Sequence, residues 1–466
     1  MLFNSFHFFA FFPIVLIGYF LLPFRYRNPF LLISSLYFYG SWKLSYLALL
    51  LAGTLIDWAL AIAIDASQSQ RRRFQWLLAS LLSNTGALFF FKYYDFFSAQ
   101  INLAVGNEPW LPALHLALPI GISFYLFQSM GYVIDVYRRV IPAERSFPFF
   151  LLFVSYFPHM VAGPIQRSKH LMSQLRERYV PDPKRFVRGL RLMLWGFFKK
   201  VVIADNMADY VNLVFDNPKP GHGCVLAVAT LFFAYQIYCD FSGYSDIARG
   251  ASLMFGVDLM VNFRNPYSSP SVTEFWQRWH ISLSTWFRDY LYVPLGGNRV
   301  SIVLWMRNIL IVFLVSGLWH GANWTFVVWG GIHAVMFIIE RLALNRIGWE
   351  SAPRCLRVTI TFFVVCIAWI FFRSGSVQHA QTIIRNIFFK WGDMERVLWP
   401  IGQRVYLLFG LIVALELFQR WQKQALFDEW ADSLRTPVRW ALYLFLTALL
   451  LYVGDYKERE FIYFQF

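Results

Sequence analysis

Long apolar runs separated by short polar gaps dominate this sequence from its first residues to its last. A helix needs about 20 consecutive apolar residues to cross the hydrocarbon core of a bilayer. Candidate runs with little or no internal charge are 3–22, 44–64, 76–91, 116–134, 225–238, 302–319, 324–339, 358–372, 405–417 and 440–453. The pattern predicts an all-α polytopic membrane protein with roughly 10–12 crossings, and the shorter runs are compatible with re-entrant or interfacial helices.

We interpret residues 1–466 as one membrane domain, within which the distribution of polar residues changes twice. Residues 1–140 are separated apolar helices, 141–345 hold most of the embedded polar residues and form the expected catalytic core, and 346–466 return to simple spans. The first run has no clear small-x-small cleavage site after it, so we expect a retained helix rather than a signal peptide. The short run 147–161 is a candidate re-entrant segment, which hints at an internal chamber.

Composition and charge support this interpretation. Hydrophobic residues make up 58% of the chain and charged residues 15%, whereas soluble domains are about a quarter charged. The net charge of +15 lies in alternate gaps, as in Arg25–Arg27, Arg71–Arg73 and Arg138–Arg145, which is the positive-inside pattern rather than a nucleic-acid surface. It predicts a multi-pass membrane protein with its N-terminus outside. The four cysteines form no C-x-x-C pair, so neither a disulfide framework nor a metal site is predicted.

The densest polar and aromatic stretch runs from 262 to 299. Ser271 lies three residues before Glu274, the spacing of a capping box that begins a helix. Apolar residues then recur at helical spacing, which predicts one amphipathic helix too polar to cross a membrane: Phe275, Trp279, Leu283 and Trp286. His280 on this helix is either an interfacial histidine held by hydrogen bonds or a functional group.

Three arginines in the same stretch, Arg278, Arg288 and Arg299, allow two interpretations. Ordinary inside-facing charge explains each of them singly. Together they could hold the phosphates of a cytosolic donor, because a guanidinium group pairs with phosphate oxygens through parallel hydrogen bonds.

A second polar segment, 316–324 (SGLWHGANW), interrupts the apolar tract from 302 to 339. Its histidine, His320, is expected deep in the membrane, where Gly317 and Gly321 let the backbone bend or pack closely. Burying a polar side chain without partners costs about 2–7 kcal/mol. His320 is therefore either a hydrogen-bonded contact between helices or a general base, because neutral imidazole accepts a proton near pH 7.

Two further polar positions have mainly structural interpretations. His333 lies thirteen residues beyond His320 and is expected to be a packing contact. The cluster 239–246 (CDFSGYSD) follows an apolar run. Helix ends and a turn around Gly243 are the slightly favoured explanation, and a polar wall of the same chamber is the alternative.

The two histidine-containing segments resemble the motifs of a known protein family. The strings EFWQRWHISLSTWFRDYLYVPLGGNR and SGLWHGANWTFVVWGGIHA resemble the two signature blocks of the membrane-bound O-acyltransferases. They are most similar to the bacterial branch that acetylates alginate, cellulose or peptidoglycan. The start MLFNSFHFFAFFPIV and the end FIYFQF are similar to the same branch, so the resemblance covers essentially the whole chain.

The resemblance implies a helical fold around a central funnel or tunnel. By motif match, the essential histidine of the family corresponds to His320 and its second histidine to His280. The implied activity moves an acetyl group from a cytoplasmic donor toward the hydroxyls of an extracytoplasmic polysaccharide such as alginate. Acetyl-CoA is the expected donor, no cofactor is expected to stay bound, and an esterase-like (SGNH) periplasmic partner is expected.

Acyl transfer needs a nucleophile, a base that activates it and donors for the developing oxyanion. His320 is the predicted base, and Trp319, Asn323 and His280 are candidates for orientation or charge stabilisation. Tyr463 carries the only hydroxyl in residues 461–466. It is either a transient acyl carrier or an interfacial aromatic anchor.

Two other classes of protein would also have many helices and buried polar groups. A transporter or flippase for a polysaccharide precursor often shows inverted repeats or matched broken helices, and none is evident in this sequence. A non-catalytic membrane scaffold leaves a deep histidine flanked by glycines without a purpose. Alginate, cellulose, another exopolysaccharide and peptidoglycan all remain compatible acceptors.

Overall fold

The structure is a computed structural model that describes residues 1–106, 110–160, 163–217, 222–344, 348–399, 401–423, 425–457 and 459–464. All regular structure in these residues is helical, which confirms the expected all-α polytopic fold. Seven described helical segments are long and apolar enough to cross a membrane: Leu44–Ala66, Gln70–Val105, Gly223–Met254, Ile302–His320, Trp324–Leu344, Arg354–Arg373 and Thr436–Val453.

This number is below the expected 10–12 crossings, because several apolar runs form helices that are too short or too charged. Helix α1 (Phe6–Leu21) has 16 residues, and so has α6 (Ile122–Tyr137). Helix α19 (Arg404–Trp421) has 18 residues, but it includes Arg404, Glu416 and Arg420.

The chain forms two compact units, the first of residues 1–190 and 248–260 and the second of residues 191–247 and 261–466. In the first unit, the helices besides α1 and α6 are α2 (Phe24–Gly40), α3 (Leu44–Ala66), α4 (Gln70–Leu88), α5 (Tyr94–Val105), α7 (Phe147–Ser155), α8 (Phe157–Met160) and α9 (Ser168–Arg176). The candidate re-entrant run is therefore two short helices, and its last residue, Val161, lies outside the described residues.

A buried carboxylate joins three helices of the first unit. Asp57 of α3 accepts hydrogen bonds from Ser80 and Asn84 of α4, at 2.6 and 2.8 Å, and from Ser129 of α6. Because an unpaired buried carboxylate is costly, these donors turn a polar residue in an apolar helix into a fixed contact.

All residues predicted to carry chemistry belong to the second unit. Its main helices begin with the end of α10 (Pro183–Phe197) and include α11 (Asp205–Phe215), α12 (Gly223–Met254) up to residue 247, α13 (Val272–Arg278), α14 (Ile281–Phe287), α15 (Ile302–His320), α16 (Trp324–Ile339), α17 (Arg354–Arg373), α18 (Val377–Phe389), α19, α20 (Phe427–Asp432) and α21 (Thr436–Val453). Short π- and 3₁₀-helical segments join some of them, among them η2 (Phe198–Ala204), η4 (Arg288–Tyr292), η5 (Glu340–Leu344) and η8 (Ile462–Phe464).

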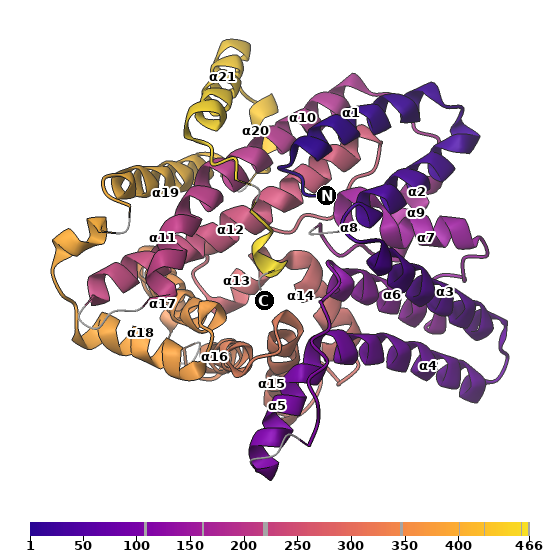
Figure 1. Cartoon of the computed structure of the whole chain (residues 1–466), viewed down its shortest axis with the longest axis horizontal. Coiled ribbons are helices and arrows are strands. Elements are labelled where there is room, and N and C mark those ends of the chain that lie inside the picture. Colours follow the sequence, from indigo (N-terminus) through magenta and orange to yellow (C-terminus); the bar gives the residue numbers. More distant parts are fainter. Residues whose placement is uncertain are drawn as a thin grey trace. The chain divides into compact units, whose positions relative to one another are not determined.

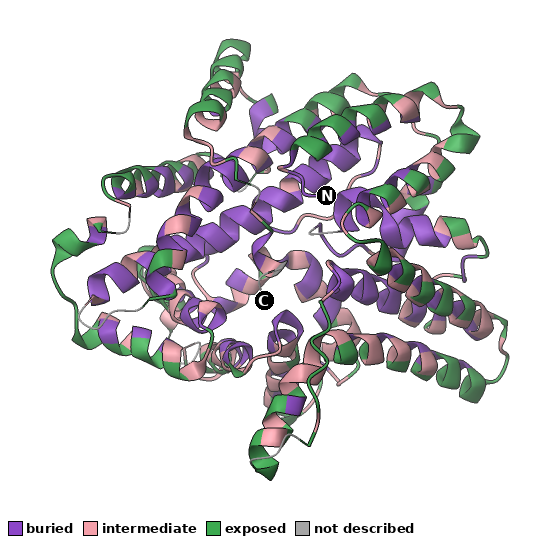
Figure 2. Cartoon of the chain, viewed as in Figure 1, coloured by how far each residue is buried: buried purple, intermediate pink, exposed green. Residues whose placement is uncertain are grey.

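Helix α12 is surrounded by protein along most of its length (Figures 1 and 2). Protein covers 83% of its most apolar window, against 6–39% for the other six membrane-length segments. The cluster 239–246 lies inside this helix, which continues through Gly243, so the favoured prediction of a turn there is wrong. The glycine serves a close helix approach instead, because a Cβ at Gly243 would lie 2.8 Å from the carbonyl oxygen of Gly196 in α10.

Helices α15 and α16 pack backbone against backbone. A Cβ at Gly317 would lie 2.3 Å from the carbonyl oxygen of Phe326, and one at Gly330 would lie 2.3 Å from that of Phe313. Real Cβ atoms do not approach so closely, so these positions require glycine. The close packing expected at Gly317 is confirmed, and it fixes how the His320 end of α15 meets the start of α16.

The neighbouring glycines Gly330 and Gly331 of α16 provide a matched test. Gly330→Ala forces the α15 backbone away, whereas a Cβ at Gly331 meets nothing within 4 Å. We expect Gly330→Ala to lower stability by about 1–3 kcal/mol, as overpacking does. Gly331→Ala should be neutral or stabilising by up to about 1 kcal/mol, because alanine has the higher helix propensity. Thermal unfolding in detergent measures both, and equal melting temperatures for the two variants would contradict this packing.

Candidate functional site

His320 is the last residue of α15, at a helical corner rather than in the middle of a span. It is 4% exposed, so its ring does not lie on a lipid-facing surface. Asn323 fixes the corner. Its side-chain oxygen accepts the Thr325 N–H at 3.1 Å and caps α16, and its amide donates to the Gly375 carbonyl at 2.9 Å. Asn323 thus orients the backbone that carries His320.

Aromatic rings surround the imidazole of His320. The ring centroids of Trp319, Trp329, Tyr463 and Phe372 lie 4.9, 5.0, 5.3 and 5.4 Å from that of His320. The imidazole of His320 therefore lies in a largely aromatic environment.

His280 lies between two short helices and not on one long amphipathic helix, so that expectation is wrong. The backbone at His280 is left-handed, with φ 43°, and separates α13 from α14. Asn262 causes the break, since its carbonyl oxygen accepts the Ile281 N–H at 3.0 Å and its side-chain oxygen accepts the Ser282 N–H at 3.2 Å. The same side-chain oxygen lies 3.3 Å from Nδ1 of His280.

The two histidines belong to one aromatic cluster. His280 is fully buried, and its ring centroid lies 6.2 Å from that of Trp319 and 4.6 Å from that of Phe241. Trp319 in turn contacts His320. The structure therefore brings His280, Trp319 and His320 together, and it adds Phe241 of α12, which the sequence did not single out.

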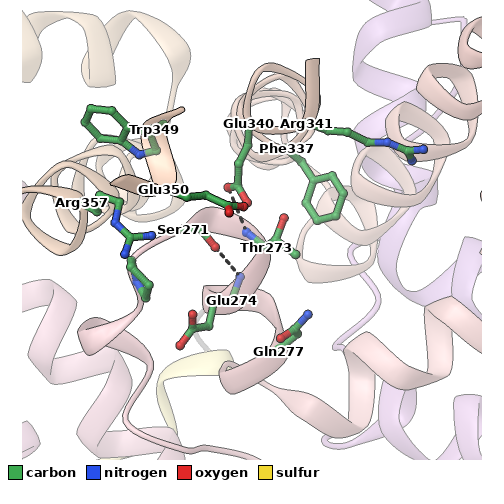
Figure 3. Close-up of a pocket in the computed structure, with 11 residues that line it drawn as sticks. Ser271, Thr273, Glu274, Gln277, Phe337, Glu340, Arg341, Trp349, Glu350 and Arg357 are labelled. Carbon is green, nitrogen blue, oxygen red and sulfur yellow. Dashed lines mark hydrogen bonds between the residues drawn. The ribbon is translucent and has the colours of Figure 1, made fainter. Parts of the chain in front are cut away.

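The predicted cap of α13 is present. Ser271 Oγ accepts the Glu274 N–H at 3.0 Å, and Glu274 itself forms an ion pair with Arg278. Glu340 of η5 accepts the Val272 N–H at 2.8 Å and the Thr273 N–H at 3.2 Å, the second of which is drawn in Figure 3. Residues from two parts of the second unit, 271–278 and Glu340, thus hold the helix start that precedes His280.

The three arginines predicted as donor contacts have different surroundings. Arg278 pairs with Glu274 and donates to Ser268 Oγ at 3.1 Å, Arg288 pairs with Asp289 at 2.8 Å, and Arg299 is exposed. Only Arg288 lines the cavity nearest the histidines, so the structure does not gather the three around one point.

Two cavities flank α13. One of about 400 Å³ has mainly apolar walls and extends from Arg288 and Tyr292 to Phe313 and Ser316, one helical turn before His320. The other, of about 730 Å³, is lined by Glu274, Glu340 and Glu350 and by two arginines, and neither histidine reaches it (Figure 3). Neither histidine lines the smaller cavity, but Ile281, which follows His280, and Ser316, four residues before His320, do, so this cavity is the one next to the histidine cluster.

The end of the chain enters this cluster. The segment follows α21 and lies beside α12 (Figure 1, yellow), and the Ile462 N–H donates to Asp240 Oδ2 of α12 at 2.7 Å. Tyr463 then places its ring 5.3 Å from that of His320 and 4.9 Å from that of Phe241. Its hydroxyl oxygen is buried and has no hydrogen-bond partner among the described residues.

Sequence reasoning left out Lys200, which lies in η2 and forms ion pairs with Asp240 and Asp205 at 2.6 and 2.9 Å. The signal was present, because Lys199 and Lys200 interrupt an apolar run, and charged residues in such runs are rare and usually paired. The aromatic residues Phe241, Trp329 and Phe372 gave no such signal among so many others.

Comparison with known proteins agrees with the family resemblance of the two histidine-containing segments. A model of the membrane-bound O-acyltransferase family, MBOAT, matches residues 113–377. A protein of Azotobacter vinelandii named "Probable alginate O-acetylase AlgI" is 41% identical over 391 residues, which cover 83% of this chain and 77% of that protein. A Pseudomonas aeruginosa protein of the same name is 42% identical over 82% of this chain and 73% of its own length. The "Peptidoglycan O-acetyltransferase" of Helicobacter pylori is 35% identical over 83% of this chain and 80% of its own length.

The burial of His280 leads to a prediction for stability at acid pH. Burial lowers the pKa of His280 from 6.5 to about 3. Between these values the unfolded chain binds the proton and the folded chain does not, so this residue destabilises the fold increasingly as the pH falls below 6.5. At pH 5 the cost is about 2 kcal/mol.

His280→Asn removes the titrating group and tolerates the left-handed backbone. We expect the melting temperature of this variant to fall less between pH 7 and pH 5 than that of the wild type. His115→Asn is the control, because His115 is exposed and also has a positive φ of 48°. Identical pH profiles for the wild type and His280→Asn would contradict the prediction.

Proposed function

We propose a specific reaction for this chain, which belongs to the membrane-bound O-acyltransferase family and is a multi-pass membrane O-acetyltransferase. In this reaction an acetyl group passes from cytoplasmic acetyl-CoA to hydroxyls of an extracytoplasmic polysaccharide, with His320 as the general base. The observation that carries the proposal is the contact between the rings of His320 and Tyr463, at a centroid distance of 5.3 Å.

Tyr463 is the first acceptor of the acetyl group in this scheme. Burial raises the pKa of Tyr463 far above its usual range, so its hydroxyl is a poor nucleophile until a base removes the proton. A neutral imidazole in ring contact with it is suited to that task. His280 and Trp319 carry N–H groups in the same cluster, and we assign them to orientation and to stabilisation of the oxyanion.

The first step forms one ester bond and breaks one thioester bond. His320 accepts the hydroxyl proton of Tyr463 while the phenolic oxygen attacks the carbonyl carbon of acetyl-CoA. The C–S bond then breaks, the thiolate takes the proton from the imidazolium, and free CoA leaves. In the second step an acceptor hydroxyl attacks the carbonyl carbon of the acetyl-tyrosine ester and gives its proton to His320. The C–O bond to tyrosine breaks, the acetyl ester forms on the acceptor, and the imidazolium returns the proton to the tyrosine oxygen.

The cavity of about 400 Å³ supports a path for the donor. Arg288 at its lining can pair with phosphate oxygens of the donor. The apolar walls fit the pantetheine arm, and Ser316 leads to His320 one turn further along α15. Arg278 and Arg299 keep the alternative role of inside-facing charge in this scheme.

The acceptor side is proposed from the relatives. Two of them are named as alginate O-acetylases and one as a peptidoglycan O-acetyltransferase. We therefore propose an extracytoplasmic polysaccharide such as alginate as the final acceptor, reached through an esterase-like periplasmic partner. The alternate basic gaps of the sequence support an inner-membrane location with a periplasmic N-terminus.

His320→Ala tests the base. A general base contributes about 10²–10⁴-fold to rate, so the variant should insert and fold normally and yet leave the polymer essentially unacetylated. The matched control is His333→Ala, because His333 is also buried and its ring lies 5.1 Å from that of Trp329, as that of His320 lies 5.0 Å away. Acetate released from purified polymer, normalised to the protein in the membrane, is the measurement. Wild-type acetylation in His320→Ala would refute the mechanism.

Tyr463→Phe tests the carrier. The variant keeps the ring and its contacts with His320, Phe241 and Phe372, but it lacks the hydroxyl. We expect Tyr463→Phe to lose polymer acetylation. Under turnover, the C-terminal peptide of the wild type should carry an added acetyl group of about 42 Da, and that of the variant should not. Tyr452→Phe, at an exposed tyrosine of α21, is the control. A fully active Tyr463→Phe would show that the acetyl group passes directly from donor to acceptor.

A further inference from the structure

Three ionisable side chains form a buried cluster in the second unit. The Lys200 ammonium lies 2.6 Å from a carboxylate oxygen of Asp240 and 2.9 Å from one of Asp205. The three side chains are 2–4% exposed, so little water screens their charges. One cation facing two carboxylates leaves Asp240 able to accept a further hydrogen bond, and charge-assisted hydrogen bonds are the strong ones.

That further donor comes from the end of the chain. The Ile462 N–H donates to Asp240 Oδ2 at 2.7 Å, and Tyr463 is the next residue. Phe241, the residue after Asp240 on α12, contacts the rings of Phe461 and Tyr463 at 5.2 and 4.9 Å. Asp240 thus binds the peptide group between Phe461 and Ile462, and Phe241 packs against the rings on either side of Ile462.

A second anchor lies further from His320. Arg459 pairs with Asp209 and Asp455 at 2.7 Å each, and the Asp455 N–H donates to the Val201 carbonyl at 3.1 Å. These contacts hold residues 455–459 against α11 and η2. They do not hold residues 461–463, which contact α12 instead. The hydrogen bond to Asp240 is the polar contact nearest to Tyr463.

We infer that Asp240 is a positioning residue, which holds Ile462 so that the ring of Tyr463 lies against His320. Lys200 and Asp205 act through Asp240, because the Lys200 ammonium pairs with both carboxylates and fixes the side chain of Asp240 in place. The catalytic consequence rests on the proposed function, whereas the placement of the segment does not. The carboxylate deep in α12 is then explained by the chain end that it binds.

Two substitutions separate the hydrogen bond from the charge. Asp240→Ala removes both the acceptor and the negative charge, and it leaves Lys200 paired with Asp205, so that one cation faces one carboxylate. Asp240→Asn removes the charge and keeps an oxygen that can accept the Ile462 N–H. Glu416→Ala is the control, because that carboxylate lies in the same unit and loses a hydrogen bond of 3.0 Å from the Tyr235 hydroxyl.

Hydrogen exchange of the detergent-solubilised full chain, followed by mass spectrometry of the C-terminal peptide, measures placement without activity. We expect Asp240→Ala to accelerate exchange in this peptide by about tenfold or more. Asp240→Asn should recover most of the protection, and Glu416→Ala should change nothing there. With acetyl-CoA as donor, kcat should fall by about tenfold or more in Asp240→Ala while KM stays within about twofold, since Asp240 does not line the donor cavity.

Unchanged exchange of the C-terminal peptide in Asp240→Ala overturns the inference, whatever the activity. Faster exchange with an unchanged kcat also overturns it, because the position of the segment would then not affect the reaction. Failure of the proposed function is seen separately, in a fully active Tyr463→Phe with the C-terminal peptide still protected.

Discussion

The contact between the rings of His320 and Tyr463 is the interaction on which the proposed reaction depends, because it places the proposed base beside a tyrosine 143 positions later in the chain, 320 to 463. The chain reaches this arrangement from two directions. The α15–α16 corner presents the histidine, and the docked C-terminal segment presents the tyrosine. Neither residue has this environment without the other elements of the unit.

Close backbone packing and buried charge work together in this arrangement. Glycines at positions 317 and 330 let α15 and α16 approach, and the pair at positions 196 and 243 does the same for α10 and α12. The second approach brings Lys200 of η2 to Asp240 of α12. Since buried charges are costly unless paired, the cluster remains only because its members satisfy one another and the chain end.

Much of this could be predicted from local sequence, and the rest depends on distant partners. Apolar runs predicted most of the long helices, and the spacing of Ser271 and Glu274 predicted the start of α13. The break at His280 was missed because Asn262, 18 residues earlier, imposes it. Gly243 was assigned to a turn because a glycine in a helix gives the same local pattern whether it bends or packs closely. The docking of Ile462 on Asp240 spans 222 positions and has no local signature.

His280 and His320 also show which features local sequence can predict and which need the fold. The motif identified His280 and His320, but only the fold shows that Trp319 contacts both and that Phe241 lies between His280 and Tyr463. Candidate donor contacts were chosen by charge alone, and the fold assigns Arg278 to Glu274 instead of to a cavity. Charge without a position was therefore the weakest guide to the site.

The most direct test of the central claim is photocrosslinking from position 463 in native membranes. Replacing Tyr463 with p-benzoyl-phenylalanine keeps an aromatic ring at the chain end, and mass spectrometry of the crosslinked peptides reports which residues it touches. The account predicts crosslinks to the peptides that contain His320 and Phe372. Crosslinks only to lipid, or to peptides outside the second unit, would contradict it.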